Sequence, residues 1–258
     1  MKLAFEVFGD ATQPPLIILH GFFASARNWR NVAEKLATQF YVYVLDQRNH
    51  GGSFHDAVMD YPTMTMDLLR FIEQQGLSRV SLLGHSMGGK VTMWFALNYP
   101  DRVDKLIVVD IAPVSYPHNL NNTIGALQAL PLEQIGNRKQ AEALLAESIP
   151  ELNYRQFLLQ NLVLVNGAYG WRVDLDIFYQ AAPAIIAFPD TDKLAPFVGN
   201  SLFIAGEHSD YVKEETIRDL FPGAKLCVIA GAGHWLHVQQ PVIFIAEVEK
   251  FLTQTVTG

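Results

Sequence analysis

The chain has 258 residues, half of them hydrophobic and 17% charged, a composition typical of a globular protein with a packed core. Its formal net charge is −7 and its 19 lysines and arginines form no basic run, which argues against a nucleic acid as partner. A single cysteine, Cys227, cannot form an internal disulfide, and its apolar surroundings predict a buried strand residue.

The N-terminal residues break their apolar run with Glu6 and Asp10 before the core of a signal peptide could form. The longest apolar stretches, such as residues 181–188, are much shorter than the roughly 20 residues that a membrane span needs. The sequence therefore predicts a cytoplasmic protein without an integral membrane segment. It leaves the oligomeric state open.

Short apolar runs bounded by turn residues recur along the chain and predict buried strands at residues 16–19, 41–45, 80–83, 106–109, 202–205 and 226–229. Amphipathic segments of helical length lie between most of them, at residues 26–37, 63–75, 91–98 and 242–252. This alternation predicts an α/β fold with a mainly parallel sheet covered by helices on both faces. Residues 3–8, with apolar side chains at every second position, predict an added edge strand.

The alternation breaks between residues 114 and 195, where helical patterns at 124–130, 139–148 and 154–165 follow one another without a clear strand. We therefore expect a core made of residues 1–113 and 196–258, and a helical cap made of residues 114–195. The cap is inserted after the strand that ends at Asp110. It should lie over the carboxyl edge of the sheet, where open α/β sheets bind ligands.

The segment Gly84-His85-Ser86-Met87-Gly88 follows a predicted strand and precedes a predicted helix. In this context a G-x-S-x-G pattern indicates a nucleophile elbow, a sharp strand-to-helix turn with the serine at its tip. The two glycines are needed because side chains on either side of so tight a turn would collide. Ser86 is the predicted nucleophile.

The same stretch also reads as a phosphate-binding pattern, because Gly84 and Gly89-Lys90 have the required spacing. A phosphate-binding loop needs Ser or Thr directly after the lysine to hold magnesium, and this chain has Val91 there. The sequence therefore disfavours a nucleotide site.

Near the C-terminus, His234 follows a predicted strand and two glycines, Gly231 and Gly233, in a loop that can return its imidazole to the sheet edge. It is the predicted general base. A metal site shared with His237 is the alternative, but a three-residue spacing without a cysteine or carboxylate cluster is poor evidence for one. No metal and no cofactor are predicted.

An acyl-transfer site also needs two backbone N–H groups, the oxyanion hole, directed at the tetrahedral intermediate. Met87, directly after the nucleophile, is predicted to supply one of them. The other is predicted at Phe22, in the loop after the strand at residues 16–19. The ring of Phe22 is also expected to form part of the pocket wall.

Taken together, these motifs resemble the α/β-hydrolase superfamily over the whole chain, and within it the YbfF-type bacterial esterases and related abhydrolase-domain proteins. The segments that carry the resemblance are residues 20–21, 46–53, 84–88, 109–113, 206–212 and 230–235. The resemblance implies hydrolysis of carboxylic esters, with acyl thioesters as a further option, and no cofactor. Residues 46–53 contain Asp46, Arg48 and His50 and are expected to tie a turn together by hydrogen bonds.

The acid that orients His234 has two candidates. Many members of this superfamily carry an aspartate at the position of Ser209, so the chain departs from that pattern, and Asp210 lies one residue later. Asp110, at the carboxyl end of a predicted strand, is the alternative that the YbfF-type resemblance favours. Asp110 is preferred because a strand end holds a carboxylate more firmly than a polar loop does.

The predicted reaction is attack of Ser86 on an acyl carbonyl of a small-molecule ester or thioester, followed by hydrolysis of the acyl-enzyme. Apolar residues of the cap are expected to shape an acyl pocket, namely Leu127, Leu145, Phe157, Leu158 and Phe178, although such stripes more often form the core of a helical unit. A lyase or a carbon–carbon bond hydrolase with the same triad is the first alternative. A binding protein without catalysis is the second.

Overall fold

The computed structural model describes residues 2–254. Within this range a sheet of seven strands has the order β1-β3-β2-β4-β5-β8-β9, and every neighbouring pair is parallel except β1 and β3. The strands are β1 (Phe5–Phe8), β2 (Pro15–Leu19), β3 (Tyr41–Leu45), β4 (Val80–His85), β5 (Val103–Val109), β8 (Ser201–Gly206) and β9 (Lys225–Ile229). The six strands predicted from the apolar runs are all present, and β1 is the predicted edge strand. The predicted α/β fold with a mainly parallel sheet is confirmed.

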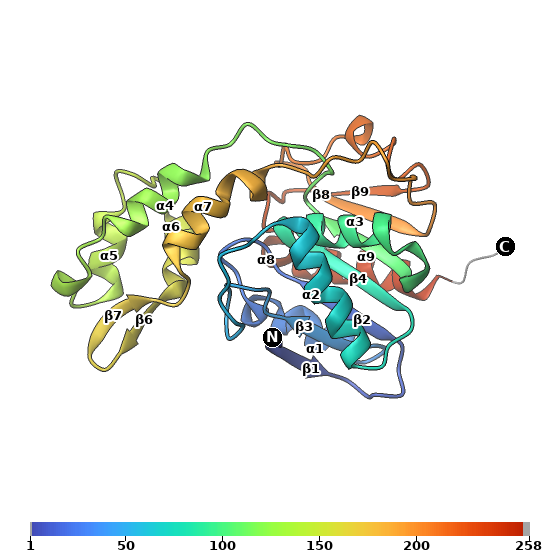
Figure 1. The fold of residues 1–258 in the computed structure, drawn as a ribbon, viewed down its shortest axis with the longest axis horizontal. Helices are drawn as coiled ribbons and strands as arrows, with labels where there is room; N and C mark the ends of the chain where they lie inside the picture. The colour runs from blue at the N-terminus through green and yellow to red at the C-terminus, as the bar shows by residue number, and fades with distance from the viewer. Residues whose placement is uncertain (1, 255–258) are drawn as a thin grey trace.

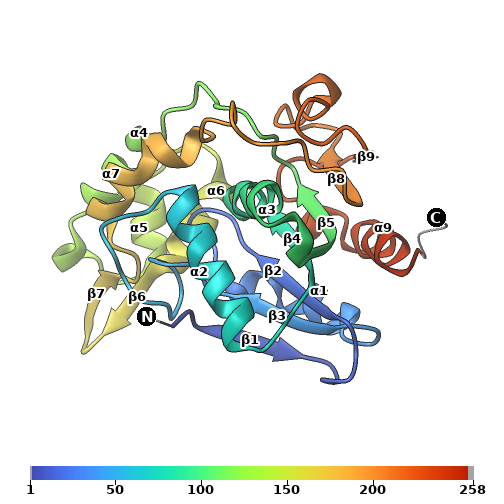
Figure 2. The same ribbon diagram turned by 45° about the vertical axis from the view of Figure 1, so that its right-hand side comes forward.

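Helices cover both faces of this sheet, as Figures 1 and 2 show. Helices α2 and α3 lie on one face, and α1 and α9 lie on the other. Their bounds are α1 (Arg30–Leu36), α2 (Tyr61–Gln74), α3 (Met87–Asn98) and α9 (Pro241–Thr253), with a short α8 (Leu236–Gln239) before the last. The predicted starts differ by four residues at α3, which begins at Met87 rather than residue 91, and at α1, where residues 26–29 form a 3-10 turn before the α-helix.

Alternation along the strands explains why both faces are covered. In β2, Ile17 and Leu19 face the cluster that contains α2 and α3, whereas Leu16 and Ile18 face the cluster that contains α1 and α9. A strand that is apolar at every position has no face that water can solvate, so both faces must be buried under helices. The carboxyl ends of the parallel strands are thereby left as the accessible edge.

The segment between β5 and β8, which we call the insert (residues 114–195), lies to the left of the sheet in Figure 1. It contains α4 (Leu120–Gln128), α5 (Arg138–Leu144), α6 (Leu152–Leu158), β6 (Leu162–Val165), β7 (Ala168–Trp171) and α7 (Leu175–Ile186). The predicted helix at 154–165 is wrong in its second half, because β6 and β7 pair as an antiparallel hairpin. The predictions near α4 and α5 are right in kind.

The hairpin has a clear local cause. Its turn is Asn166-Gly167, and both residues have positive φ, 52° and 83°. A two-residue hairpin turn of the favoured hand requires this backbone conformation, and Asn-Gly is the pair that adopts it most readily. The apolar and β-branched residues of β6 suit a strand better than a helix.

Two hydrogen-bonded side chains of the core hold the end of α7. The Tyr61 hydroxyl donates to the Ile185 carbonyl oxygen at 2.6 Å. The Lys90 ammonium donates to the carbonyl oxygens of Ile186 and Ala187 at 2.8 and 2.7 Å. Carbonyl groups at a helix C-terminus have no partner within the helix, so a cation there is favourable. These bonds fix the insert against α2 and α3.

The edge of the sheet opposite β1 is formed by β9, where the expectation of a buried cysteine is not met. Cys227 lies in β9, as predicted, but β9 is an edge strand and the cysteine is only half-buried.

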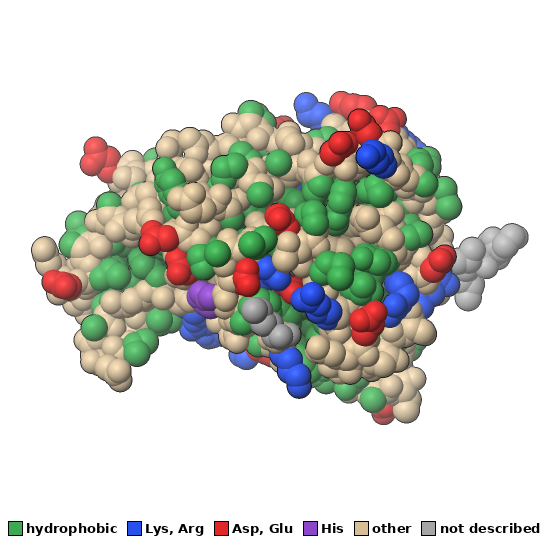
Figure 3. Space-filling model, in the orientation of Figure 1, with side chains coloured by type: hydrophobic (Ala, Val, Ile, Leu, Met, Phe, Trp, Pro, Cys, Tyr) green, Lys and Arg blue, Asp and Glu red, His purple; other side chains and the backbone are tan. Residues whose placement is uncertain are grey.

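Residues 255–258 of the predicted core lie outside the described part of the chain. Among residues 2–254, no helix combines the length and the apolar character that crossing a membrane requires. On the face drawn in Figure 3, acidic and basic side chains are interspersed in small groups.

Two glycines allow a test of how tightly the chain is packed at the end of β4. A Cβ at Gly84 would lie 2.3 Å from the Gly88 carbonyl oxygen, whereas a Cβ at Gly125 in α4 would meet nothing within 4 Å. We expect Gly84→Ala to lower the free energy of unfolding by about 1–3 kcal/mol or more. The control Gly125→Ala should raise it by about 0.5–1 kcal/mol, because alanine favours a helix. Urea denaturation measures both, and equal stability of Gly84→Ala and the unmodified chain would contradict the packing described.

Candidate active site

The predicted nucleophile sits at a sharp turn between β4 and α3. Ser86 has φ 52° and ψ −118°, a conformation that non-glycine residues rarely adopt, and α3 begins at the next residue. The turn is possible because Gly84 and Gly88 lie against backbone: a Cβ at Gly88 would be 2.4 Å from the Leu19 carbonyl oxygen. The sequence pattern and the local geometry of a nucleophile elbow therefore agree.

A buried carboxylate and an imidazole meet beside this turn. Nδ1 of His234 lies 2.7 Å from Oδ2 of Asp110, and the Asp110 side chain is 0% exposed. Two other donors reach the same carboxylate: the Gly206 N–H donates to Oδ1 at 3.0 Å, and the Ser209 hydroxyl donates to Oδ2 at 2.5 Å. Because a carboxylate only accepts, a neutral His234 ring would carry its proton on Nδ1, which makes Nε2 the acceptor.

The two candidate acids are thus in different positions. Asp110 directly follows β5 with a left-handed φ of 50°, and its carboxylate reaches the end of β8. Asp210 is exposed, and none of its contacts in residues 2–254 is a hydrogen bond or ion pair with His234. Ser209 stands where many superfamily members carry the acid, and its hydroxyl supports the Asp110 carboxylate. The departure at position 209 is visible in the sequence, but the hydrogen bond from Ser209 to Asp110 is not.

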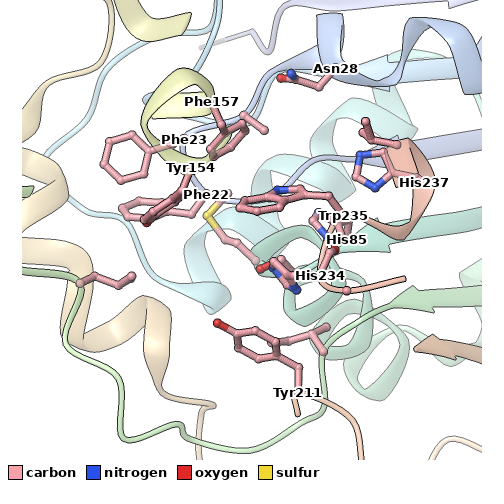
Figure 4. A pocket seen from close by; sticks show the side chains of 18 of the residues that line it. Phe22, Phe23, Asn28, His85, Tyr154, Phe157, Tyr211, His234, Trp235 and His237 are labelled. Carbon is pink, nitrogen blue, oxygen red and sulfur yellow. Dashed lines mark hydrogen bonds between the residues drawn. The ribbon is translucent and has the colours of Figure 1, made fainter. Parts of the chain in front are cut away.

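Several contacts hold the loop that carries His234. The Gly231 N–H donates to Glu207 Oε2 at 2.8 Å, and the Gly233 N–H donates to Gln239 Oε1 at 2.7 Å. The His234 ring lies between two other rings, His85 at 4.7 Å and Tyr211 at 4.5 Å between centroids. Figure 4 shows the three rings together at the cavity wall. Sequence reasoning gave His85 and Tyr211 no role, although both lie in segments that carry the resemblance, because the patterns there do not specify what these two side chains contact.

The loop after β2, which carries the predicted oxyanion donor Phe22, is fixed from two sides. The Phe23 N–H donates to Nε2 of His50 at 3.2 Å, and the Asn161 amide of the insert donates to the Phe23 carbonyl oxygen at 2.7 Å. Phe22 itself stacks on Phe178 at 4.5 Å between ring centroids. The other predicted donor, Met87, is the first residue of α3, and the first N–H groups of a helix have no partner within the helix.

Backbone strain is concentrated around these residues. In the described part of the chain, five non-glycine residues have φ above 0°, namely Phe23, Asn49, Ser86, Asp110 and Asn166. Three of them, Phe23, Ser86 and Asp110, belong to the loops at the ends of β2, β4 and β5. Such conformations persist only where the surroundings enforce them, and they cluster at functional sites. Their position is consistent with a site at the carboxyl edge of the sheet.

The segment at residues 46–53 makes the structural contacts expected of it. Asp46 accepts hydrogen bonds from the backbone N–H groups of Ala26 and Gly52 at 2.7 and 2.8 Å. Arg48 forms a two-point ion pair with the buried Asp67, at 2.6 and 2.9 Å. His50 supports the loop after β2 through Phe23, so this segment positions the site without lining its cavity.

A cavity of about 870 Å³ lies between the carboxyl edge of the sheet and the insert. Ser86 and His234 both line it, together with the loop after β2, the start of α3, α6 and the end of α7. Aromatic residues dominate part of its wall, including Phe22, Phe23, Tyr154, Phe157 and Trp235. Amide side chains also line the cavity, namely Asn28, Asn153, Gln156, Gln160 and Gln239.

Of the insert residues predicted to shape the pocket, only Phe157 lines it. The other four, Leu127, Leu145, Leu158 and Phe178, are buried within the insert and against the core instead. Their apolar stripes pack helices together, which is the commoner use of such a pattern. The prediction of a pocket is therefore right in place but wrong for most of the residues named.

Burial shifts the acid–base behaviour of several groups around the cavity. Burial lowers the pKa of Lys90 to about 7, and Lys90 lies in the interior of α3 rather than in a phosphate-binding loop. Burial, and then the nearby His234, lower the pKa of His237 to about 3, and that ring stacks on Trp29 at 4.2 Å. Among residues 2–254, no three His, Cys, Asp or Glu side chains form a group that could hold a metal ion.

Comparisons with known proteins add independent information. A family model described as an alpha/beta hydrolase fold matches residues 14–241. The chain is 39% identical over 255 residues to the sn-1-specific diacylglycerol lipase ABHD11 of Mus musculus, covering 95% of this chain and 82% of the mouse protein. It is 35% identical over 242 residues to Esterase YbfF of Escherichia coli, covering 93% of this chain and 92% of that protein. A solved structure described as a marine microorganism esterase is 40% identical with a TM-score of 0.92, covering 97% of this chain and 99% of that one.

The two aspartates give a direct test of the site. We expect Asp110→Asn to lower turnover of an ester substrate by up to about 10⁴-fold, the loss that the wrong imidazole tautomer causes in a serine protease. Asp210→Asn should have little effect, because Asp210 is exposed and does not contact His234. Circular dichroism first shows whether both variants are folded. Steady-state kinetics then compare their turnover numbers. The reverse ranking would identify Asp210 as the acid and leave Asp110 with a structural role.

Proposed function

Because the chain belongs to the α/β-hydrolase fold family, we propose that it is a serine esterase that cleaves carboxylic esters through Ser86, His234 and Asp110. The observation that carries the proposal is the 2.7 Å contact between His234 and the buried Asp110, beside a cavity that both His234 and Ser86 line. The names of the relatives support it, since the mouse protein is a lipase and the bacterial protein is an esterase.

In the proposed reaction, Oγ of Ser86 attacks the acyl carbonyl carbon while Nε2 of His234 accepts the hydroxyl proton. The imidazolium then gives this proton to the leaving alcohol, and the acyl group stays on Ser86 as an ester. A water molecule attacks that ester with His234 again as base, and the acid and free Ser86 result. Asp110 keeps the proton of His234 on Nδ1 and stabilises the imidazolium by its negative charge.

Charge on the carbonyl oxygen of the tetrahedral intermediate needs hydrogen-bond donors in fixed positions. We assign this role to the backbone N–H groups of Phe22 and Met87. The contacts of Phe23 with His50 and Asn161 support the assignment, because they hold the loop that carries Phe22. The start of α3 adds a favourable dipole at Met87.

The insert is proposed to act as a cap that closes the cavity over Ser86. Aromatic side chains from its helix α6 and from the loop after β2 suit an apolar acyl group, whereas the amide side chains near Asn28 suit a neutral polar leaving group.

Acyl thioesters remain a second prediction, since they would form the same acyl-enzyme. The cytoplasmic location is still a prediction from the sequence.

Replacement of the nucleophile tests the proposal. We expect Ser86→Ala to abolish hydrolysis of p-nitrophenyl butyrate, because no other side chain in the proposed mechanism can attack the carbonyl. The variant should remain folded, since the change removes only one hydroxyl group. If a folded Ser86→Ala variant keeps most of its activity, the proposed mechanism is wrong. Poor cleavage of p-nitrophenyl esters by the unmodified chain would favour the lyase or carbon–carbon hydrolase alternative.

The pH dependence tests the base. Activity should fall as the solution is acidified from pH 8 toward pH 5, because only a neutral imidazole can accept the proton from Ser86. His237 has its pKa lowered to about 3 and stays neutral throughout this range, so it should not contribute. Lys90, whose pKa is lowered to about 7, gains a proton in the same range.

Repeating the pH profile with Lys90→Met separates the two groups. The decline on the acidic side should persist in this variant if His234 is responsible for it. A profile of kcat that becomes flat in Lys90→Met would assign the ionisation to Lys90. A flat profile in the unmodified chain would argue against any histidine base.

A further inference from the structure

His85 is next to the proposed nucleophile in the chain, and its side chain contacts the backbone of the proposed base. It is the last residue of β4 and is bonded through its backbone to Ser86. Its Nε2 lies 2.9 Å from the backbone carbonyl oxygen of His234, a residue 149 positions further along the chain. The imidazole is 4% exposed, and its centroid is 4.7 Å from that of the His234 ring.

The direction of this hydrogen bond is determined by its partner. A carbonyl oxygen can only accept, so His85 carries its proton on Nε2 and donates it. Nδ1 of His85 faces Gly21, where a Cβ would approach to 3.1 Å. The ring is therefore enclosed between the base loop on one side and the loop after β2 on the other, and it has little freedom to turn.

The charge of His85 is also compatible with catalysis next to it. Burial lowers the pKa of His85 well below its usual range, and the neighbouring His234 and His237 lower it further. A neutral ring keeps its donor without placing a second positive charge beside the imidazolium that His234 must form. A protonated His85 would oppose that step.

Within residues 2–254, the other hydrogen bonds of the loop that carries His234 do not reach β4 or α3. Gly231 is held by Glu207, and Gly233 is held by Gln239, and both partners lie outside β4 and α3. The Asp110 carboxylate orients the ring of His234 but does not touch its backbone. The bond from His85 therefore links the backbone of the base directly to the residue next to the nucleophile.

We propose that His85 is a positioning residue, whose hydrogen bond to the His234 carbonyl sets the spacing between the nucleophile Ser86 and the base His234. The inference rests on the proposed function, because it assigns the spacing a role in the transfer of a proton between these two residues. It goes beyond that function by giving a role to the variable residue that precedes the serine in the elbow.

Substitutions at position 85 separate the hydrogen bond from the packing. Leucine fills similar space and has no donor, whereas the amide nitrogen of glutamine can occupy nearly the same place as Nε2 of histidine. We expect His85→Leu to lower kcat for p-nitrophenyl butyrate about 10–100-fold with little change in KM, because a small misplacement of reacting groups is costly. His85→Gln should recover most of the lost kcat.

A matched control distinguishes this effect from lost stability. Ile72→Ala in α2 truncates a fully buried side chain away from the site, so it should lower the Tm while leaving kcat unchanged. If His85→Leu does not fold, His85→Asn replaces it, because asparagine is polar but too short to reach the His234 carbonyl. Asparagine should then be slow where glutamine is fast.

Three results would overturn the inference. One is a folded His85→Leu or His85→Asn variant with the kcat of the unmodified chain. Another is a glutamine variant as slow as the leucine variant at equal Tm. The third is a loss of kcat in Ile72→Ala equal to that in His85→Leu, which would make stability the cause. Activity retained by Ser86→Ala in the same series would instead overturn the proposed function itself, and this inference with it.

Discussion

The buried carboxylate of Asp110 accepts hydrogen bonds from Gly206, Ser209 and His234, and it has no exposed surface. A charge removed from water destabilises a fold strongly unless partners replace its hydration. The ends of β5 and β8 and the loop after β9 must therefore meet at one point. The need to hydrogen-bond the buried carboxylate therefore holds three segments together that are far apart in the sequence. It also fixes the imidazole of His234 in one orientation.

The sheet supplies the rigidity that such a site needs. Ser86 and Asp110 both have left-handed backbone conformations, and each directly follows a strand whose side chains are fully buried at its end. The cost of these conformations is offset by packing in the two apolar layers, which a flexible loop could not provide. The insert then adds what the sheet lacks, namely a wall over the cavity, and Tyr61 and Lys90 hold it in place.

Much of this arrangement can be predicted from sequence, because strands, the elbow and strand-end residues such as Asp110 leave local patterns. The hairpin at Asn166-Gly167 was also predictable, but the apolar run before it was interpreted as a helix. The contacts of His85 and Ser209 could not be foreseen, since each depends on a partner about a hundred or more positions away. For the same reason, helical periodicity could not tell that Phe157 lines the cavity while Phe178 is buried.

In the proposed mechanism, Ser86 is a nucleophile activated by His234 and Asp110. Treatment with diethyl p-nitrophenyl phosphate followed by peptide mass spectrometry tests it most directly, because the serine oxygen would attack phosphorus, release p-nitrophenolate and keep a stable diethylphosphoryl group. We expect one such group per chain, on Ser86, with loss of esterase activity in proportion to labelling. A phosphoryl group on another residue, or full ester hydrolysis by a chain already labelled at Ser86, would contradict it.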